Sequence, residues 1–282
     1  MATIGIQIFL PEGDPNGLKI VELSGWVGKA FVIPRAKLRD VKNREEAVHP
    51  GVYFLFGEGK DASRKKVYIG ESETFLNRLL NHDDNKDFWN EAVVFTGGLN
   101  RAYVKYLENR SVNLAKKIDR YEIVNQVEPL ENRISEFEKA GADDFFEKIK
   151  LLLGVLGFTI FQEIPRRQDV SDIYRFQTDS ADASGTLLDT GEFIVFKGST
   201  SRIRETESFI KGISGPNLRK RLEAEGILRR NNEESFVFVK DYIFNSPSAA
   251  GDVVAGRSVN GWTSWKDEQG KTLDENKRKT AE

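Results

Sequence analysis

Five side chains between residues 53 and 108 combine the groups that a phosphodiester-cleaving site needs. They are two tyrosines, an arginine, a histidine and a glutamate: Tyr53, Tyr68, Arg78, His82 and Glu108. A carboxylate can hold a divalent cation, an arginine can neutralise the charge of a phosphorane, and tyrosine or histidine can move protons. Taken singly, each residue has a commoner structural explanation, since tyrosine is frequent in strands and glutamate on helix surfaces. Their value depends on whether the fold brings them together.

The local pattern predicts elements that place the two tyrosines side by side. Residues 51–57 and 65–70 have the composition of two strands, and the glycines and polar residues between them are typical of a hairpin loop. Tyr53 and Tyr68 lie on these neighbouring strands, so we expect their hydroxyls to face the same space.

Two predicted helices carry the other groups. Ser72 is placed to cap a helix over 73–81, on which Arg78 and His82 are four residues apart and share a face. Residues 100–117 predict a longer amphipathic helix, and Glu108 lies within it.

The rest of the chain predicts a mixed α+β fold. We expect strands at 3–10, 18–23, 28–34, 88–95, 186–188, 192–197 and 236–239, and helices at 36–47, 145–156 and 217–225. Polar stretches at 131–144 and 166–182 are candidate boundaries. The predicted organisation is a β-rich extension (1–47), a first domain (48–130), a helical connector (131–185), a second small α+β domain (186–275) and a tail (276–282).

Composition restricts the chemistry. The 282-residue chain has no cysteine and two histidines, which excludes disulfides, thiolate zinc sites and a multi-histidine metal site. Any metal is therefore expected to be a hard cation with oxygen ligands, Mg²⁺ or Mn²⁺. No segment approaches the roughly 20 apolar residues of a membrane span. We expect a cytoplasmic protein without a membrane partner, and nothing in the sequence indicates its oligomeric state.

The order of the chemical residues resembles the GIY-YIG nuclease family over about residues 48–130. The matching pieces are Gly51-Val-Tyr53, Tyr68-Ile-Gly70, Arg78, His82, Glu108 and Asn125. In that family the two triplets form strands of a small mixed sheet flanked by helices, so the same arrangement is expected here.

The resemblance also implies roles. Glu108 would be the sole protein carboxylate on one Mg²⁺ or Mn²⁺, and Arg78 would contact the scissile phosphate. Asn125 matches a late polar residue that helps to position the site. Tyr53, Tyr68 or His82 would help to activate the attacking water, and the sequence leaves open which of them accepts the proton.

One position departs from the family pattern. Glu71 follows the second triplet where many relatives have lysine, so a phosphate contact is missing or reversed in charge. Lys65 and Lys66 are candidate substitutes for this contact, and Lys66 is the one chosen.

The second half of the chain resembles a domain of unassigned function, the DUF4357 type. The similar segments include Gly191-Glu-Phe-Ile-Val-Phe-Lys-Gly-Ser199 and Gly256-Arg-Ser-Val-Asn-Gly-Trp262. Arg257 could hold a phosphate there, and Trp262 could stack on an unpaired base.

A local excess of positive charge accompanies this half, although the whole chain carries a net charge of −2. Residues 197–230 contain nine Lys or Arg against four Glu. We expect nucleic-acid contacts from this cluster, because phosphate contacts supply most of the attraction to a nucleic acid. The residues chosen from it are Arg202, Arg219, Lys220 and Arg221.

The leading hypothesis is a single-metal endonuclease that hydrolyses DNA. A non-catalytic nucleic-acid-binding protein on the same scaffold and an RNA-cleaving enzyme are the alternatives. The sequence does not distinguish a role in repair, in mobile-element biology or in defence, and it does not identify the preferred DNA structure.

Overall fold

The computed structural model describes residues 3–58, 65–127, 129, 133–212 and 214–278. The described part of the chain folds into two compact units, the first ending at residue 164 and the second beginning at residue 165. Each unit combines helices with sheets, which confirms the α+β fold class.

The N-terminal unit is built on a seven-stranded mixed sheet in the order β1-β2-β3-β6-β4-β5-β7. All neighbours are antiparallel except β5 and β7, which run parallel. The strands are β1 (Ile6–Phe9), β2 (Lys19–Leu23), β3 (Lys29–Pro34), β4 (Gly51–Glu58), β5 (Lys65–Ser72), β6 (Trp89–Thr96) and β7 (Glu122–Ile123). The segment predicted as an N-terminal extension contributes β1, β2 and β3 to this same sheet.

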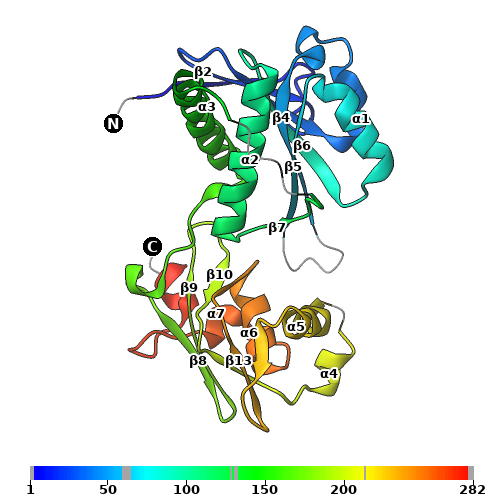
Figure 1. Cartoon of the computed structure of the whole chain (residues 1–282). Helices are drawn as coiled ribbons and strands as arrows, with labels where there is room; N and C mark the ends of the chain where they lie inside the picture. The colour runs from blue at the N-terminus through cyan, green and yellow to red at the C-terminus, as the bar shows by residue number, and fades with distance from the viewer. Residues whose placement is uncertain (1–2, 59–64, 128, 130–132, 213, 279–282) are drawn as a thin grey trace. The chain divides into compact units, whose positions relative to one another are not determined.

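Side chains alternate across β4, so the sheet has a hydrophobic core on each face. Phe54 and Phe56 face α2 (Arg101–Ile118) and α3 (Glu136–Val155), whereas Tyr53 and Leu55 face α1 (Phe75–Asn85). Figure 1 shows α1 on one side of the sheet and α2 with α3 on the other. The helix predicted over 100–117 is α2, and it begins at an Asn100 cap.

Two short 3₁₀ helices, η1 (Arg35–Val41) and η2 (Glu45–Val48), replace the helix predicted over 36–47. The buried side chains of this segment explain the difference. Leu38, Val41 and Ala47 are spaced by multiples of three, which places them on one side of a helix with three residues per turn.

The polar stretch at 131–144 is largely the start of α3 rather than a linker. Ser135 and Glu138 form a capping box, in which each side chain accepts a hydrogen bond from the other residue's backbone N–H. This cap begins the helix nine residues before the apolar segment from which it was predicted at 145.

The C-terminal unit contains a four-stranded sheet, β14-β10-β9-β8, and a three-stranded sheet, β11-β13-β12. The strands are β8 (Tyr174–Thr178), β9 (Ala181–Leu187), β10 (Phe193–Val195), β11 (Thr200–Arg202), β12 (Leu228–Arg230), β13 (Ser235–Phe238) and β14 (Tyr242–Phe244). The helices are α4 (Glu207–Ile210), α5 (Ser214–Ala224), α6 (Pro247–Ala255), α7 (Gly261–Ser264) and α8 (Leu273–Lys277). Two short 3₁₀ helices, η3 (Thr159–Phe161) and η4 (Arg167–Asp169), lie on either side of the boundary between the units.

The boundary predicted at 166–182 was wrong in part, because β8 lies within it. Its exposed polar residues alternate with the buried Tyr174 and Phe176, so the strand is a half-buried one with a polar face. In the part of the chain that the structure describes, no helix has the length and apolar character needed to cross a membrane.

Candidate active site

The two tyrosines lie on adjacent antiparallel strands and face α1. Tyr53 on β4 is opposite Gly70, and Tyr68 on β5 is opposite Leu55. The two rings stack with centroids 6.2 Å apart. Tyr53 is fully buried, whereas Tyr68 is half-buried. A Cβ atom on Gly70 would overlap the Tyr53 hydroxyl, so the glycine provides the space that this hydroxyl occupies.

The helix α1 places Arg78 and His82 against these rings. The Tyr53 hydroxyl is 2.9 Å from Nε2 of His82, and the Tyr68 and His82 ring centroids are 4.9 Å apart. The Arg78 guanidinium interacts with both tyrosine hydroxyls, which raises the pKa of Arg78. The four side chains therefore form one interacting group, in which Tyr53 and His82 are hydrogen-bonded.

The direction of the hydrogen bond between Tyr53 and His82 follows from the chemistry of the neighbouring guanidinium. A guanidinium can only donate, so the Tyr53 oxygen is the atom that interacts with Arg78. The single hydroxyl proton of Tyr53 is then available to Nε2 of His82. In this arrangement His82 is neutral and carries its proton on Nδ1.

Burial supports this protonation pattern. It raises the pKa of Tyr53 well above its ordinary value, which keeps the hydroxyl protonated. Burial, together with the positive charges of Arg78 and Lys86, lowers the pKa of His82 to about 4. His82 is therefore a neutral hydrogen-bond acceptor near pH 7, and its Nε2 is already engaged by Tyr53.

Glu108 projects from α2 into the same region, where the environment disfavours the ionised form of its carboxylate. Burial, and then repulsion from Glu71, raises its pKa to about 7, although Arg78 and Lys105 partly offset both effects. Among the described residues, none forms a hydrogen bond or an ion pair with its carboxylate. A carboxylate of this kind has a strong tendency to bind a proton or a cation.

Asn125 forms hydrogen bonds with the backbone of β5, the strand that carries Tyr68. Its Oδ1 accepts from the Ile69 N–H at 3.1 Å, and its Nδ2 donates to the Ile69 carbonyl at 2.7 Å. Because Val124 also donates to Val67, the amide of Asn125 continues the β5–β7 pairing beyond the end of β7. Asn125 therefore fixes the strand between Tyr68 and Gly70.

A cavity of about 570 Å³ collects most of the predicted residues. Tyr68, Arg78, His82, Glu108 and Asn125 line it, and Tyr53 lies beneath them without reaching its surface. These residues come from β5, α1, α2 and the segment after β7. The structure thus places six residues predicted from separate parts of the sequence in one site.

Three charged residues of this cavity were not predicted as site residues. Lys86, Lys105 and Glu71 line it, and the Lys86 ammonium lies 4.5 Å from the centroid of the Tyr68 ring. Helical spacing carried a signal for both lysines, since Lys86 follows His82 by four positions and Lys105 precedes Glu108 by three.

The donor set suits one hard cation. The described residues contain no group of three or more His, Cys, Asp or Glu side chains that could hold a metal. Glu108 and Glu71 do line the same cavity, and Mg²⁺ characteristically keeps several waters and binds one or two carboxylates. A single hydrated Mg²⁺ or Mn²⁺ is compatible with these oxygens and with the raised pKa of Glu108.

Lys66 does not replace the lysine expected at position 71. Its ammonium pairs with Glu122 at 2.9 Å across the β5–β7 ladder, and Lys66 does not line the cavity. The pairing with Glu122 on the neighbouring strand keeps the Lys66 ammonium at the β5–β7 ladder and away from the cavity.

The basic cluster of the C-terminal unit is less accessible to a nucleic acid than its composition suggests. Arg219 is 1% exposed, and its guanidinium packs over the Phe236 ring, so its prediction as a surface phosphate ligand was wrong. Arg221 pairs with Glu225 at 2.6 Å. Lys220 is exposed, and Arg202 is half-buried on β11.

Arg257 and Trp262 lie elsewhere in the same unit. Arg257 is exposed and lines a cavity described below. The Arg278 guanidinium lies 3.5 Å from the centroid of the Trp262 ring. One face of this indole is therefore already covered, which limits its predicted stacking on a base.

Comparison with known proteins identifies a family for part of the chain. Residues 174–277 match the family described as "Domain of unknown function (DUF4357)". This match confirms the DUF4357-type domain predicted from the sequence and begins with β8. No curated protein and no solved structure matches the chain. The GIY-YIG resemblance of the N-terminal unit stays a prediction.

Proposed function

We propose that this chain is a metal-dependent endonuclease of the GIY-YIG type that hydrolyses DNA phosphodiester bonds at the cavity beside β5. The carrying observation is that Tyr68, Arg78 and Glu108, far apart in sequence, line one cavity of about 570 Å³. The shifted pKa values of Glu108 and His82 support this proposal, since perturbed titratable groups in a cavity are frequent at active sites.

The chain's residues have separate roles in this proposal. Glu108 would hold a divalent cation, which would supply Lewis-acid chemistry at the phosphate when bound. Arg78 stabilises the charge that develops on the non-bridging oxygens. Lys86 and Lys105 add positive charge around the substrate phosphate.

Tyr68 is the tyrosine that we assign to the attacking water. It lines the cavity, whereas Tyr53 is buried beneath it. The water oxygen forms the new bond to phosphorus, the bond to the leaving oxygen breaks, and the leaving oxygen takes up a proton from solvent. Tyr68 accepts the proton of the water while its own proton passes to solvent. Tyr53 and His82 are positioning residues, because they hold Arg78 and the Tyr68 ring.

A panel of labelled duplex, single-stranded and branched DNA, with matched RNA, tests the proposal. With Mg²⁺ or Mn²⁺ the wild-type chain is expected to cleave DNA, and Glu108→Ala is expected to abolish cleavage. Glu147→Ala, an exposed glutamate on α3, is the matched control and should cleave normally.

Two results would refute this function. One is a Glu108→Ala protein that cuts at the wild-type rate. The other is a wild-type protein that binds nucleic acid but cleaves no DNA with either metal, which would favour the binding protein. Cleavage confined to RNA would reassign the substrate. The cytoplasmic location stays a prediction.

A further inference from the structure

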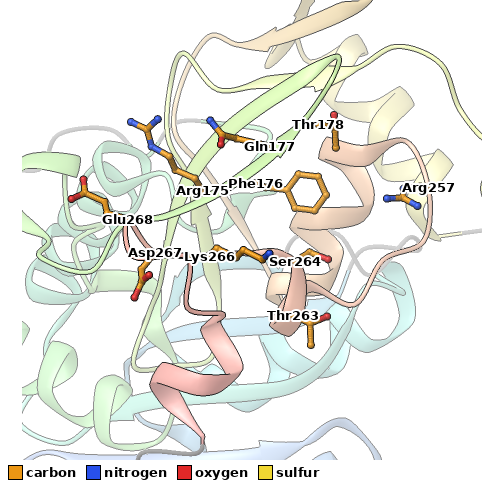
Figure 2. Close-up of a pocket in the computed structure, with 11 residues that line it drawn as sticks. Arg175, Phe176, Gln177, Thr178, Arg257, Thr263, Ser264, Lys266, Asp267 and Glu268 are labelled. Atoms are coloured by element: carbon orange, nitrogen blue, oxygen red, sulfur yellow. The ribbon is translucent and has the colours of Figure 1, made fainter.

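A second cavity, of about 760 Å³, lies in the C-terminal unit and has a different character. Three segments meet around it: the edge strand β8, the residue that follows α6, and the chain at the end of α7. They contribute Arg175, Arg257 and Lys266, together with the hydroxyl residues Thr178, Thr263 and Ser264. Figure 2 shows how these side chains are arranged.

The backbone around this cavity is firmly held. Arg175 and Lys266 exchange two backbone hydrogen bonds, of 2.6 and 3.0 Å, at the outer edge of β8. The neighbouring Trp265 is fully buried and donates from its ring N–H to the Pro247 carbonyl at 3.0 Å. Side-chain changes at Arg175 and Lys266 therefore leave the contacts that build the cavity in place.

Arg257 reaches the cavity because α6 ends at a left-handed residue. Gly256 has φ +62°, and its N–H donates to the Asp252 carbonyl, which closes the helix. The chain then turns, and in Figure 2 the Arg257 side chain extends towards the centre of the cavity. The Lys266 side chain extends towards Ser264 in the same view, whereas Arg175 extends away from both.

The three cations are exposed and unengaged. Among the described residues, none accepts an ion pair or a side-chain hydrogen bond from Arg175, Arg257 or Lys266. The carboxylate of Asp267 is already used, because it accepts from the backbone of Gln269 and Lys271 and from the Asn276 amide. The cavity is lined by three cations and by two carboxylates, Asp267 and the exposed Glu268, so the balance of charge is positive.

The edge of β8 adds a backbone donor. Outward-facing backbone groups recur at every second residue of an antiparallel strand. Since Arg175 directs its N–H and carbonyl outward to Lys266, Gln177 directs its own in the same direction. Gln177 lines the cavity, so its N–H is available to an acceptor such as a phosphate oxygen.

We propose that this cavity binds the sugar–phosphate backbone of a nucleic-acid strand. Arg257 and Lys266 would contact one phosphate, with hydrogen bonds from Ser264 and the Gln177 N–H, and Arg175 would contact a neighbouring phosphate. A strand fits better than a small anion because the cations diverge over an open cavity instead of converging on one point. Arginine, lysine, hydroxyl groups and backbone N–H are the groups that contact phosphates in protein–nucleic acid complexes.

This inference relocates the nucleic-acid contact of the C-terminal unit from α5 to the cavity beside β8. It rests on the proposed function for the choice of a nucleic acid as the ligand. The binding itself requires neither a metal nor cleavage, so the two proposals can fail separately.

Fluorescence anisotropy of the full chain with a labelled single-stranded oligodeoxynucleotide tests the site. EDTA is included to prevent cleavage. The variant is Arg257→Glu/Lys266→Glu, and the control is Lys220→Glu/Arg229→Glu, which reverses two exposed charges outside the cavity. Both variants are checked by thermal unfolding. If the charge reversals lower the unfolding midpoint, Arg257→Gln/Lys266→Gln replaces them.

The cavity variant is expected to bind on the order of tenfold more weakly or worse, and the control should bind like the wild-type chain. The slope of log affinity against log salt should become shallower by about 0.7, since Arg257 and Lys266 share one phosphate and each neutralised phosphate on a single strand contributes roughly 0.7. Equal affinity and slope for the wild-type chain and the cavity variant would overturn the proposal.

Competition with inorganic pyrophosphate separates a strand from a free phosphate compound. Displacement of the oligonucleotide by pyrophosphate only at millimolar concentrations supports a strand. Micromolar pyrophosphate binding that is lost in the cavity variant, with oligonucleotide binding unchanged, would overturn the assignment to a strand. Cavity-dependent binding by a chain that cleaves nothing would refute the nuclease and leave this site intact.

Discussion

The two cavities of this chain hold their charges in opposite ways. In the N-terminal unit Glu108 and His82 are at least partly buried, and burial moves the pKa of Glu108 up to about 7 and that of His82 down to about 4. In the C-terminal unit Arg175, Arg257 and Lys266 extend into solvent. Reactive groups need such an environment, because catalysis depends on shifted proton affinities and on dipoles that are already oriented.

Binding a phosphate backbone has different requirements. It depends on mobile, solvated cations that can replace counterions along the strand. The contrast teaches that a count of charged residues is a poor guide to either role. What distinguishes the two cavities is how much of each charge is removed from water and which neighbour faces it.

The first test of this contrast is Arg78→Ala. If Arg78 stabilises the reacting phosphate, its loss should lower the cleavage rate by roughly 10²–10³, as for other preorganised donors. Oligonucleotide affinity in EDTA should change much less, because binding is assigned to the other cavity. Single-turnover kinetics and anisotropy measure the two effects. Arg101→Ala is the control, since Arg101 is exposed and outside the cavity. Equal losses of rate and affinity would contradict the division between the cavities.

The second test removes one buried hydroxyl. Tyr53→Phe leaves Nε2 of His82 without its hydrogen-bond partner and removes the hydroxyl that interacts with Arg78, which should lower the free energy of unfolding by about 1–3 kcal/mol. Tyr121→Phe is the control, because Tyr121 is also buried but its hydroxyl has only a distant partner, Thr159, at 3.5 Å. Urea unfolding of both variants measures the difference. The two variants should not be equally stable if the hydrogen bond between Tyr53 and His82 is formed as described.

The third test uses the pH dependence of stability. The pKa of Glu108 is about 7 in the folded chain, whereas its ordinary value is 4.5. Ionisation of Glu108 therefore leaves the free energy of unfolding unchanged below about pH 4.5 and lowers it by the full amount above about pH 7. Glu108→Gln should therefore stabilise the fold increasingly as pH rises through this window. We expect about 1–2 kcal/mol at pH 8, after allowance for partial exposure. Urea unfolding at pH 4 and pH 8 measures it, and Glu147→Gln should show no such rise.

The N-terminal site was largely predictable because its residues occupy positions with strong local signals. Strand composition placed Tyr53 and Tyr68 on adjoining strands, and helical periodicity placed Arg78 and Glu108 on helices. The tertiary environment was not predictable. No local pattern shows that Tyr53 is beneath the cavity while Tyr68 lines it, or that Glu71 raises the pKa of Glu108.

The predictions that were wrong elsewhere in the chain also involve features that a local sequence pattern does not show. Counting charge could not show that Arg219 is buried, because its burial depends on α5 packing against residues distant in sequence. The strand β8 was missed because polar residues on its exposed face obscure the apolar alternation of Tyr174 and Phe176. Residues 35–48 were misassigned because 3₁₀ and α-helical spacing differ little over two turns.

A Cβ atom on Gly70 would overlap the Tyr53 hydroxyl, so two residues that are far apart in the sequence constrain each other. The glycine of the second triplet is complementary in shape to the tyrosine of the first, so a change at either position affects the other. Gly70→Ala alone should push Tyr53 away from Arg78 and His82. A smaller residue at position 53 would relieve the overlap, so a genetic screen for suppressors of Gly70→Ala should recover changes at position 53 on the neighbouring strand.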